Sequence, residues 1–211
     1  MTGKPIVIKA APALDTPLGP AWQAFKEGGV IAYPTETFYG LCVDPFNPVG
    51  VGRLFSLKGR PADRPVSLII ADLSMLKELA AEVPRAAAAL MERFWPGPLT
   101  LVLKAAPRVP ASLIASTGKV GVRLSSHPVA RALSEKLSSP ITATSANPSG
   151  AKPPATPEEV LGYFNGSLDV LIDGGELKGG LGSTVADISE GKAVIIREGE
   201  IPSSDLFEAL S

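Results

Sequence analysis

The chain has 211 residues, of which 45% are hydrophobic and 19% are charged, and its formal net charge is −1 at pH 7. This composition is typical of a globular domain that buries a core without disulfides or structural metals. A nearly neutral chain lacks the overall basic field of many nucleic-acid-binding proteins, so any anion site has to be a local cluster. One cysteine, Cys42, and one histidine, His127, leave few ligands for a zinc site.

The sequence also excludes a membrane-spanning helix, because no apolar run approaches the roughly 20 residues that such a helix needs. The longest apolar runs, such as residues 66–71, have the length of a strand. The first residues lack the apolar segment of a secretory signal peptide. A single cysteine rules out an internal disulfide and fits a reducing compartment. We therefore expect a cytoplasmic protein.

Helical and strand patterns alternate along the chain. Apolar spacing and helix-boundary residues predict helices at 19–27, 49–57, 74–81, 84–94, 128–137, 157–164 and 203–210. Short β-rich runs predict strands at 30–33, 65–70, 99–104, 120–124, 141–144, 170–172, 184–188 and 193–197. Interleaving of this kind predicts one α/β domain over residues 1–211, with a core at about 20–200. The link between the last two strands is too short for a crossover helix, so we expect a mixed sheet flanked by helices.

Two helix starts carry recognisable boundary residues. Thr156, Pro157 and Glu159 form the pattern of a capping box with proline at the first helical position. His127 precedes Pro128, which reads as the first residue of another helix. We therefore interpret His127 as a polar residue at a helix start and not as a member of a catalytic triad.

Polar side chains gather beside several predicted strands. Residues 33–41 follow a strand directly, and their hydroxyls and carboxylate suit either a small polar substrate or a capped turn. Residues 53–64 hold four cations and one anion in a segment stiffened by Pro61. Closely spaced cations suit a polyphosphate, although a solvated charged loop is the usual alternative.

Three further segments have the same character. Arg123 lies within an apolar strand, where it needs either a ligand carboxylate or a structural Asp or Glu as its partner. The hydroxyls and amide of residues 141–150 can bind phosphate or ribose oxygens, or can cap a turn. The glycines of residues 173–185 can bring backbone amides against a ligand or form a surface loop, but they make no P-loop. Arg197 follows the apolar strand 193–196 and adds one more cation.

In this order, these segments resemble the YrdC/TsaC family of threonylcarbamoyl-AMP synthases, in its short single-domain form. The resemblance runs from about residue 20 to residue 200, and the lysine-x-arginine and serine-x-asparagine pairs typical of the family are Lys58/Arg60 and Ser145/Asn147. The matching stretches are YPTETFYGL (33–41), LKGRPADRPVSL (57–68), RFWPGPLTLVL (93–103), VGVRLSSHP (120–128), ITATSANPSG (141–150), DGG (173–175), STVAD (183–187) and IIREG (195–199).

The resemblance implies a twisted mixed sheet flanked by helices around a large cationic cavity. It also implies an L-threonylcarbamoyladenylate synthase, a nucleotidyltransferase that uses L-threonine, bicarbonate and ATP with Mg²⁺ for tRNA modification. A downstream tRNA threonylcarbamoyl transferase is the expected partner. By the same resemblance, L-threonine contacts Thr35, Arg123 and Ser183, no residue binds a metal, and Lys58 and Arg60 are catalytic. ATP contacts Lys58, Arg60, Arg64, Ser145, Asn147 and Arg197.

Two alternatives remain open from the sequence. A cationic cavity can seat an RNA backbone, which would make the chain an RNA-binding module. The same fold can also serve a paralogue that uses another acyl or carbamoyl acceptor.

Overall fold

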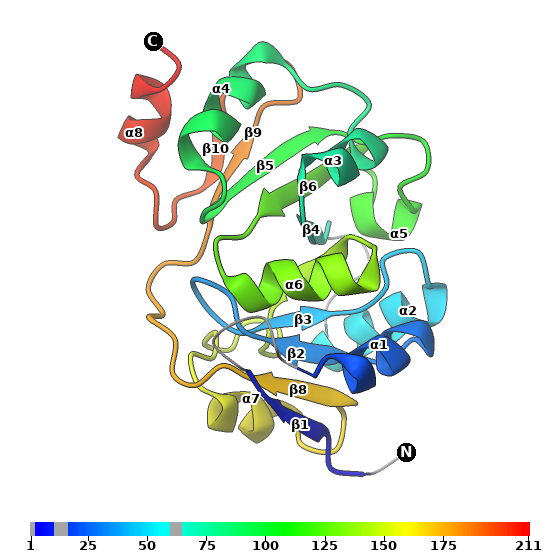
Figure 1. Cartoon of the computed structure of the whole chain (residues 1–211). Coiled ribbons are helices and arrows are strands. Elements are labelled where there is room, and N and C mark those ends of the chain that lie inside the picture. Colours follow the sequence, from blue (N-terminus) through cyan, green and yellow to red (C-terminus); the bar gives the residue numbers. More distant parts are fainter. Residues whose placement is uncertain (1–2, 11–16, 60–64) are drawn as a thin grey trace.

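The computed structural model describes residues 3–10, 17–59 and 65–211 (Figure 1). The described strands are β1 (Ile6–Lys9), β2 (Ile31–Tyr33), β3 (Gly40–Cys42), β4 (Ser67–Ile70), β5 (Leu99–Lys104), β6 (Lys119–Leu124), β7 (Ile141–Ser145), β8 (Val170–Asp173), β9 (Thr184–Asp187) and β10 (Val194–Arg197). The described helices are α1 (Gly19–Lys26), α2 (Pro48–Lys58), α3 (Leu73–Leu79), α4 (Arg85–Phe94), α5 (Ala111–Ile114), α6 (Pro128–Leu137), α7 (Pro157–Phe164) and α8 (Ser203–Glu208).

The strands form one mixed sheet in the order β1-β8-β2-β3-β7-β4-β6-β5-β9-β10. Pairing is parallel in β1–β8, β2–β8, β4–β6 and β5–β9. It is antiparallel in β2–β3, β3–β7, β4–β7, β5–β6 and β9–β10. The predicted α/β class and mixed sheet are therefore confirmed.

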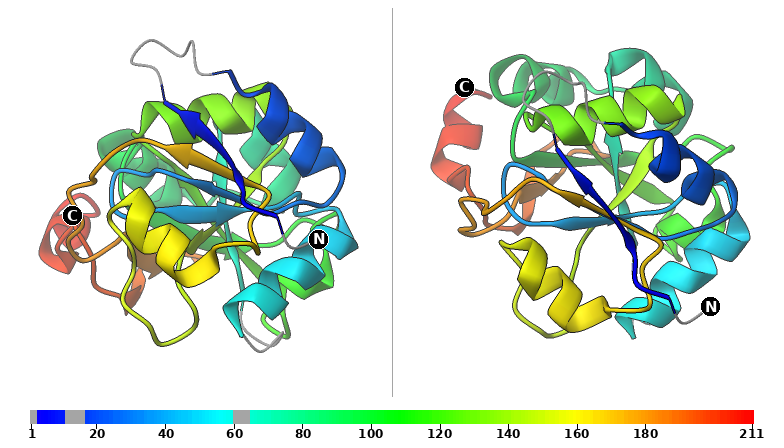
Figure 2. Two further views of the ribbon diagram at one scale, coloured as in Figure 1. Left: turned by 90° about the horizontal axis from the view of Figure 1, so that it is seen from below. Right: turned by 60° about the horizontal axis from the view of Figure 1, so that its bottom comes forward.

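Side chains alternate across this sheet and build a separate apolar core on each face. On β4, Leu68 and Ile70 belong to one core and Ile69 to the other. Helices α1 and α6 pack on the Ile69 face, whereas α2, α3, α4 and α7 contribute to the opposite core. Figure 2 shows α1 and α6 on one side of the sheet, with α2 and α7 on the other.

Every helix and strand that the sequence predicts has a counterpart in the structure, with ends that differ by at most two residues. The elements that the sequence reading missed are β1, β3 and α5. Strand β3 begins with Gly40, which strands usually avoid, and it follows the polar residues 35–37 that read as a turn. A Cβ on Gly40 would lie 3.1 Å from the Tyr33 ring, so the glycine lets the two strands pair closely.

The predicted helix boundaries are also present. The Thr156 hydroxyl accepts from the Glu159 N–H at 3.2 Å, and the Glu159 carboxylate accepts from the Thr156 N–H, which confirms the capping box. His127 caps α6, because its Nδ1 accepts from the Val129 N–H at 3.2 Å. Burial lowers the His127 pKa, and Glu36 offsets part of this effect. A neutral imidazole is the form that can accept this bond.

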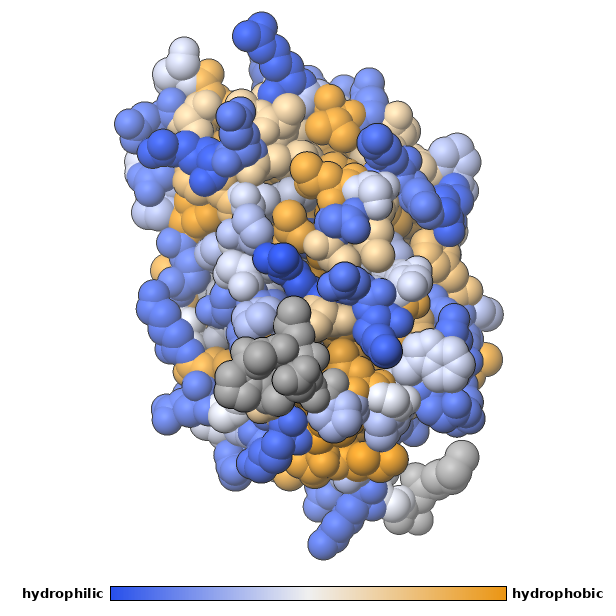
Figure 3. All heavy atoms as spheres, in the orientation of Figure 1, coloured by the Kyte–Doolittle hydropathy of each residue, from blue (hydrophilic) through white to orange (hydrophobic). Residues whose placement is uncertain are grey.

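None of the described helices is long and apolar enough to cross a bilayer. On the face drawn in Figure 3, hydrophilic side chains are interspersed with smaller groups of hydrophobic ones. The sheet ends in β1 and β10, whose exposed apolar side chains include Ile6, Val7, Val194 and Ile196.

Candidate functional site

A pocket of about 460 Å³ opens on the sheet face that carries α1 and α6. Under these helices the face is apolar, with Ile69 and Ile141 in the core. Two residues away on the same strands, Ser67 and Ala143 line the pocket. Residues two positions apart in a strand lie on the same face of the sheet. The same face is therefore part of an apolar core under the helices and lines the pocket beside them. The lining residues are Tyr33, Thr35, Thr37, Phe38, Tyr39, Gly40, Lys58, Pro65, Ser67, Thr100, Arg123, Ala143, Thr144, Ser145, Asn147, Ser149, Gly150, Pro153, Leu181, Gly182, Ser183, Val185 and Arg197.

The turn between β2 and β3 forms one wall of the pocket. The buried hydroxyl of Thr35 donates to the Phe38 carbonyl at 2.6 Å and accepts from the Thr37 N–H at 3.2 Å. The Thr37 hydroxyl lies 3.2 Å from the same oxygen and takes its second acceptor position. The turn is therefore fixed by its own hydroxyls, and Thr35 and Thr37 both line the pocket.

A second wall joins the end of α2 to the loop after β7. The buried Lys58 ammonium donates to the backbone oxygens of Ser145 and Asn147, the latter at 2.8 Å. The Ser149 N–H returns a bond to the Lys58 carbonyl at 2.8 Å. The Asn147 amide donates to Pro148 and Ala151 carbonyls at 2.9 and 2.8 Å. These bonds join Lys58, of the first family pair, to Ser145 and Asn147, which form the second. The Asn147 Oδ1 is buried and has no hydrogen-bond partner among the described residues.

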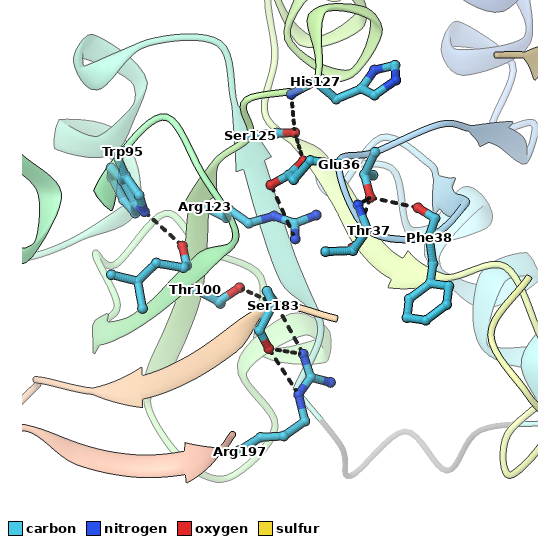
Figure 4. A network of polar contacts seen from close by, with 12 residues as sticks. Glu36, Thr37, Phe38, Trp95, Thr100, Arg123, Ser125, His127, Ser183 and Arg197 are labelled. Carbon is cyan, nitrogen blue, oxygen red and sulfur yellow. Dashed lines mark hydrogen bonds and ion pairs between the residues drawn. The ribbon is translucent and has the colours of Figure 1, made fainter. Parts of the chain in front are cut away.

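Arg123, on β6, lines the pocket, and its polar contacts are drawn in Figure 4. Its side chain is 7% exposed and its Nη1 is 3.7 Å from the Glu36 Oε1. The other Glu36 oxygen accepts from the Ser125 hydroxyl, which in turn accepts from the His127 N–H at 3.2 Å. From the sequence, the partner of Arg123 could be either a ligand carboxylate or a structural Asp or Glu. Glu36 is such a structural carboxylate. The pair is too long for a hydrogen bond. Arg123 Nε and Glu36 Oε1 are buried and have no hydrogen-bond partner in the part of the chain that the structure describes.

The third wall comes from β5, β9 and β10. The Ser183 hydroxyl is 3.0 Å from the Thr100 hydroxyl. Arg197 donates to the Ser183 carbonyl at 2.7 and 3.2 Å and to its hydroxyl at 3.1 Å (Figure 4). Burial, and then the charge of Arg123, lower the Arg197 pKa, although a guanidinium keeps its proton in proteins. Two cations that repel each other across one pocket favour an anion between them.

The glycine-rich segment from residue 174 to residue 182 reaches the pocket at Leu181 and Gly182. The Tyr39 hydroxyl accepts from the Gly174 N–H at 3.0 Å and donates to the Gly175 carbonyl at 2.7 Å. Burial raises the Tyr39 pKa to about 12, so this hydroxyl remains a donor at neutral pH. The Glu200 carboxylate accepts from the Leu181 N–H at 2.7 Å. The segment is therefore anchored at both ends.

Seven of the predicted site residues line this pocket, namely Thr35, Lys58, Arg123, Ser145, Asn147, Ser183 and Arg197. Arg60 and Arg64 lie outside the described residues. The sequence reading missed Ser67 and Thr100 as lining residues. Both are polar residues in otherwise apolar strands, which is the same signal that singled out Arg123.

The family model of Sua5, YciO and YrdC, described as "Telomere recombination", matches residues 23–199. The chain is 42% identical over 185 residues to threonylcarbamoyl-AMP synthase of Pyrococcus abyssi, covering 88% of this chain and 54% of that protein. It is 38% identical over 197 residues to threonylcarbamoyl-AMP synthase of Bacillus subtilis, covering 91% of this chain and 56% of that protein. The crystal structure of P. abyssi Sua5 complexed with L-threonine has a TM-score of 0.91 at 38% identity, covering 98% of this chain and 60% of that one.

The chain thus spans about half the length of these curated relatives. The match to the family model covers most of the chain, and both the sequence identity and the fold agree with it. The chain belongs to the Sua5/YciO/YrdC family.

Proposed function

We propose that this domain forms L-threonylcarbamoyladenylate and pyrophosphate from L-threonine, bicarbonate and ATP, for threonylcarbamoyladenosine in tRNA. The observation that carries the proposal is the lining of the pocket. Lys58, Arg123 and Arg197 meet there among hydroxyls, and none of the described lining residues is a carboxylate. Such a lining suits a ligand set with several anionic groups, such as an amino-acid carboxylate and a triphosphate. The names of the P. abyssi and B. subtilis relatives support the same reaction.

L-threonine fits the part of the pocket between Thr35, Arg123 and Ser183. The Arg123 guanidinium is buried and offers paired N–H donors, which match a carboxylate. Thr35 lines the same part of the pocket, and we expect its side chain to contact the substrate. The P. abyssi relative has been solved with L-threonine bound, which supports this assignment.

ATP fits the other wall of the pocket. Lys58, Arg60, Arg64 and Arg197 would face its phosphates, and Ser145 and Asn147 its ribose or phosphate oxygens. The buried Asn147 Oδ1 has no hydrogen-bond partner within the described protein, so a ribose hydroxyl would satisfy it. We expect Mg²⁺ to enter with the nucleotide, because phosphate and water oxygens are its preferred ligands.

The proposed chemistry has two steps. The threonine amine adds to the carbon of CO₂, which forms from bicarbonate with loss of hydroxide, and the amine then gives up a proton that combines with this hydroxide as water. The product is N-carboxythreonine. A carbamate oxygen then attacks the α-phosphorus of ATP, and the bond from that phosphorus to the β-phosphate oxygen breaks. Pyrophosphate leaves, and threonylcarbamoyladenylate remains for a downstream tRNA threonylcarbamoyl transferase. Positioning and charge neutralisation by Lys58, Arg60 and Arg197 supply the catalysis.

The proposal is tested by pyrophosphate release from ATP and bicarbonate, with and without L-threonine. We expect release that depends on L-threonine, is absent with L-serine and is lost in Lys58→Ala. Lys77→Ala, which changes an exposed lysine of α3, is the matched control and should retain wild-type release. ATP binding without threonine-dependent release would instead indicate another acceptor. RNA binding that is lost steeply with salt, without ATP binding, would indicate the RNA-binding module.

A further inference from the structure

We propose that Glu36 is a positioning residue, which holds the Arg123 guanidinium so that its N–H groups face a substrate carboxylate. The inference rests on the proposed function for the identity of that carboxylate. Arg123 lines the pocket and Glu36 does not, so Glu36 acts on the ligand only through Arg123.

The position of Glu36 is fixed from outside the pocket. Its Oε2 accepts from Ser125, a buried hydroxyl that directly follows β6. The Ser125 oxygen accepts from the His127 N–H at the start of α6. Figure 4 shows the series His127, Ser125, Glu36 and Arg123 in this order. The β6–α6 connection and the β2–β3 turn therefore together fix the position of the Arg123 guanidinium.

The geometry of the Glu36–Arg123 pair distinguishes a positioning role from a purely structural ion pair. A structural pair between a carboxylate and a guanidinium normally closes to about 2.7–2.9 Å and often uses two parallel bonds. Here the closest approach is 3.7 Å, and Arg123 Nε has no hydrogen-bond partner in the described protein. The carboxylate thus compensates the buried charge while leaving guanidinium donors for a ligand.

The lower side of Arg123 in Figure 4 faces Ser183, which Thr100 and Arg197 hold in place. A carboxylate bound there would lie between the Arg123 guanidinium and Ser183. Without Glu36 the flexible Arg123 side chain would lose its countercharge on the opposite side. It would then turn towards solvent or towards the pocket opening, and the carboxylate would lose a preformed partner.

The first test measures Arg123 directly and needs no substrate. In ¹⁵N-labelled protein, the Arg123 Nε–H signal is identified by its loss in Arg123→Lys. We expect Glu36→Gln to shift and broaden this signal and to speed its exchange with water. Glu92→Gln, on the exposed side of α4, is the matched control and should leave the signal unchanged. An Arg123 signal that is the same in Glu36→Gln as in the wild type overturns the proposal.

The second test separates the two substrates by pyrophosphate-release kinetics. We expect Glu36→Gln to raise the KM for L-threonine about tenfold, because the charged hydrogen-bond donor of Arg123 would no longer be oriented towards the substrate. The KM for ATP should change less than about twofold. Glu36→Asp restores the charge and should recover part of the difference. In the Arg123→Lys background, Glu36→Gln should add less than about twofold, because the two residues act as one unit. Independent, additive penalties, or an equal rise in both KM values, overturn the proposal.

These tests also separate this inference from the proposed function. If the wild-type protein shows no threonine-dependent turnover, the proposed function fails, and the Arg123 signal still decides whether Glu36 holds the guanidinium. If Glu36→Gln does not fold, Ser125→Ala replaces it, because it keeps both charges and removes the hydroxyl that anchors Glu36. Ser125→Ala should broaden the Arg123 signal too, and an unchanged signal counts against the proposal in the same way.

Discussion

The ammonium group of Lys58 donates to the backbone oxygen of Asn147 at 2.8 Å, although 89 residues separate the two in the sequence. This bond joins the end of α2 to the loop after β7. Lys58 of the first family pair and Ser145 and Asn147 of the second therefore form a single wall of the pocket. Lys58 has two tasks in this arrangement, since it brings a positive charge to the site and also fixes the loop that presents Ser145 and Asn147.

The first prediction concerns the structural task of Lys58. Lys58→Met keeps the apolar stem but leaves the Ser145 and Asn147 carbonyls without this donor. Buried polar groups that lose a partner cost about 1–3 kcal/mol, so we expect the free energy of unfolding in urea to fall by that amount. Threonine-dependent pyrophosphate release should fall by at least about 100-fold, as when a preorganised donor is lost.

Lys77→Met is the control for this prediction, because Lys77 is exposed on α3. It should leave both quantities within experimental error of the wild type. A Lys58→Met protein with wild-type stability would show that the loop does not depend on this bond.

Most secondary structure could be predicted because its signals are local. Apolar spacing marks the helices, and the capping box before α7 lies within four consecutive residues. Strand β3 was missed because its identity depends on a distant partner: Gly40 pairs with Tyr33 on one side and with Ser145 on the other. Strand β1 likewise lies at the sheet edge beside β8, far along the chain.

The candidate site shows the same division. Arg123 could be singled out because a charge in an apolar strand is visible in the sequence. Its partner could not be chosen from the sequence, because Glu36 reaches it across the pairing of distant strands. Thr100 was missed for a related reason: a threonine suits a strand by itself, and only the sheet brings it within 3.0 Å of the Ser183 hydroxyl.

The second prediction concerns the contact between Thr100 and Ser183. Thr100→Val keeps the side-chain shape but removes the hydroxyl that meets Ser183. Loss of one neutral hydrogen bond is worth about 1 kcal/mol, so we expect the KM for L-threonine to rise about fivefold. The KM for ATP should change less than about twofold if Ser183 serves the threonine end.

Thr117→Val is the matched control for this prediction. Thr117 is exposed and is not among the pocket-lining residues, and its hydroxyl donates to the Ile114 carbonyl at 2.6 Å. The control therefore also removes a hydroxyl that makes a hydrogen bond, but it should leave both KM values unchanged. An effect of Thr100→Val on the KM for ATP alone would assign Ser183 to the nucleotide end instead.

The third prediction concerns stability in acid. Burial raises the Asp187 pKa, but bonds from Lys119 and Ser189 outweigh this effect and leave the pKa below its ordinary value. A carboxyl group with a lowered pKa in the folded state stabilises the fold above its unfolded pKa of about 3.9, and this contribution is lost as the pH falls through the folded value. The wild type should therefore be more stable than Asp187→Asn at pH 7, with the difference shrinking below about pH 4.

Urea unfolding of both proteins between about pH 3 and pH 7 measures this difference. Glu92→Gln, at an exposed position of α4, is the control for the removal of one surface carboxylate. A difference between the wild type and Asp187→Asn that stays constant across this range would mean that the Asp187 charge contributes nothing to the stability of the fold.

The last prediction concerns Gly199, which follows β10 and lies against the backbone that joins Ser183 to Thr184. A Cβ at this position would lie 2.4 Å from the Ser183 carbonyl carbon and from the Thr184 nitrogen, so Gly199→Ala requires the backbone to move. Movement there would also displace the Ser183 groups to which Arg197 donates. Overpacking of this kind typically costs about 1–3 kcal/mol of unfolding free energy, and we expect threonine-dependent turnover to fall as well.

Gly162→Ala is the matched control: a Cβ there meets no atom within 4 Å, and alanine should stabilise α7 by about 0.5–1 kcal/mol. If Gly199→Ala has wild-type stability and turnover, the close approach of Gly199 to the Ser183 backbone does not position Ser183.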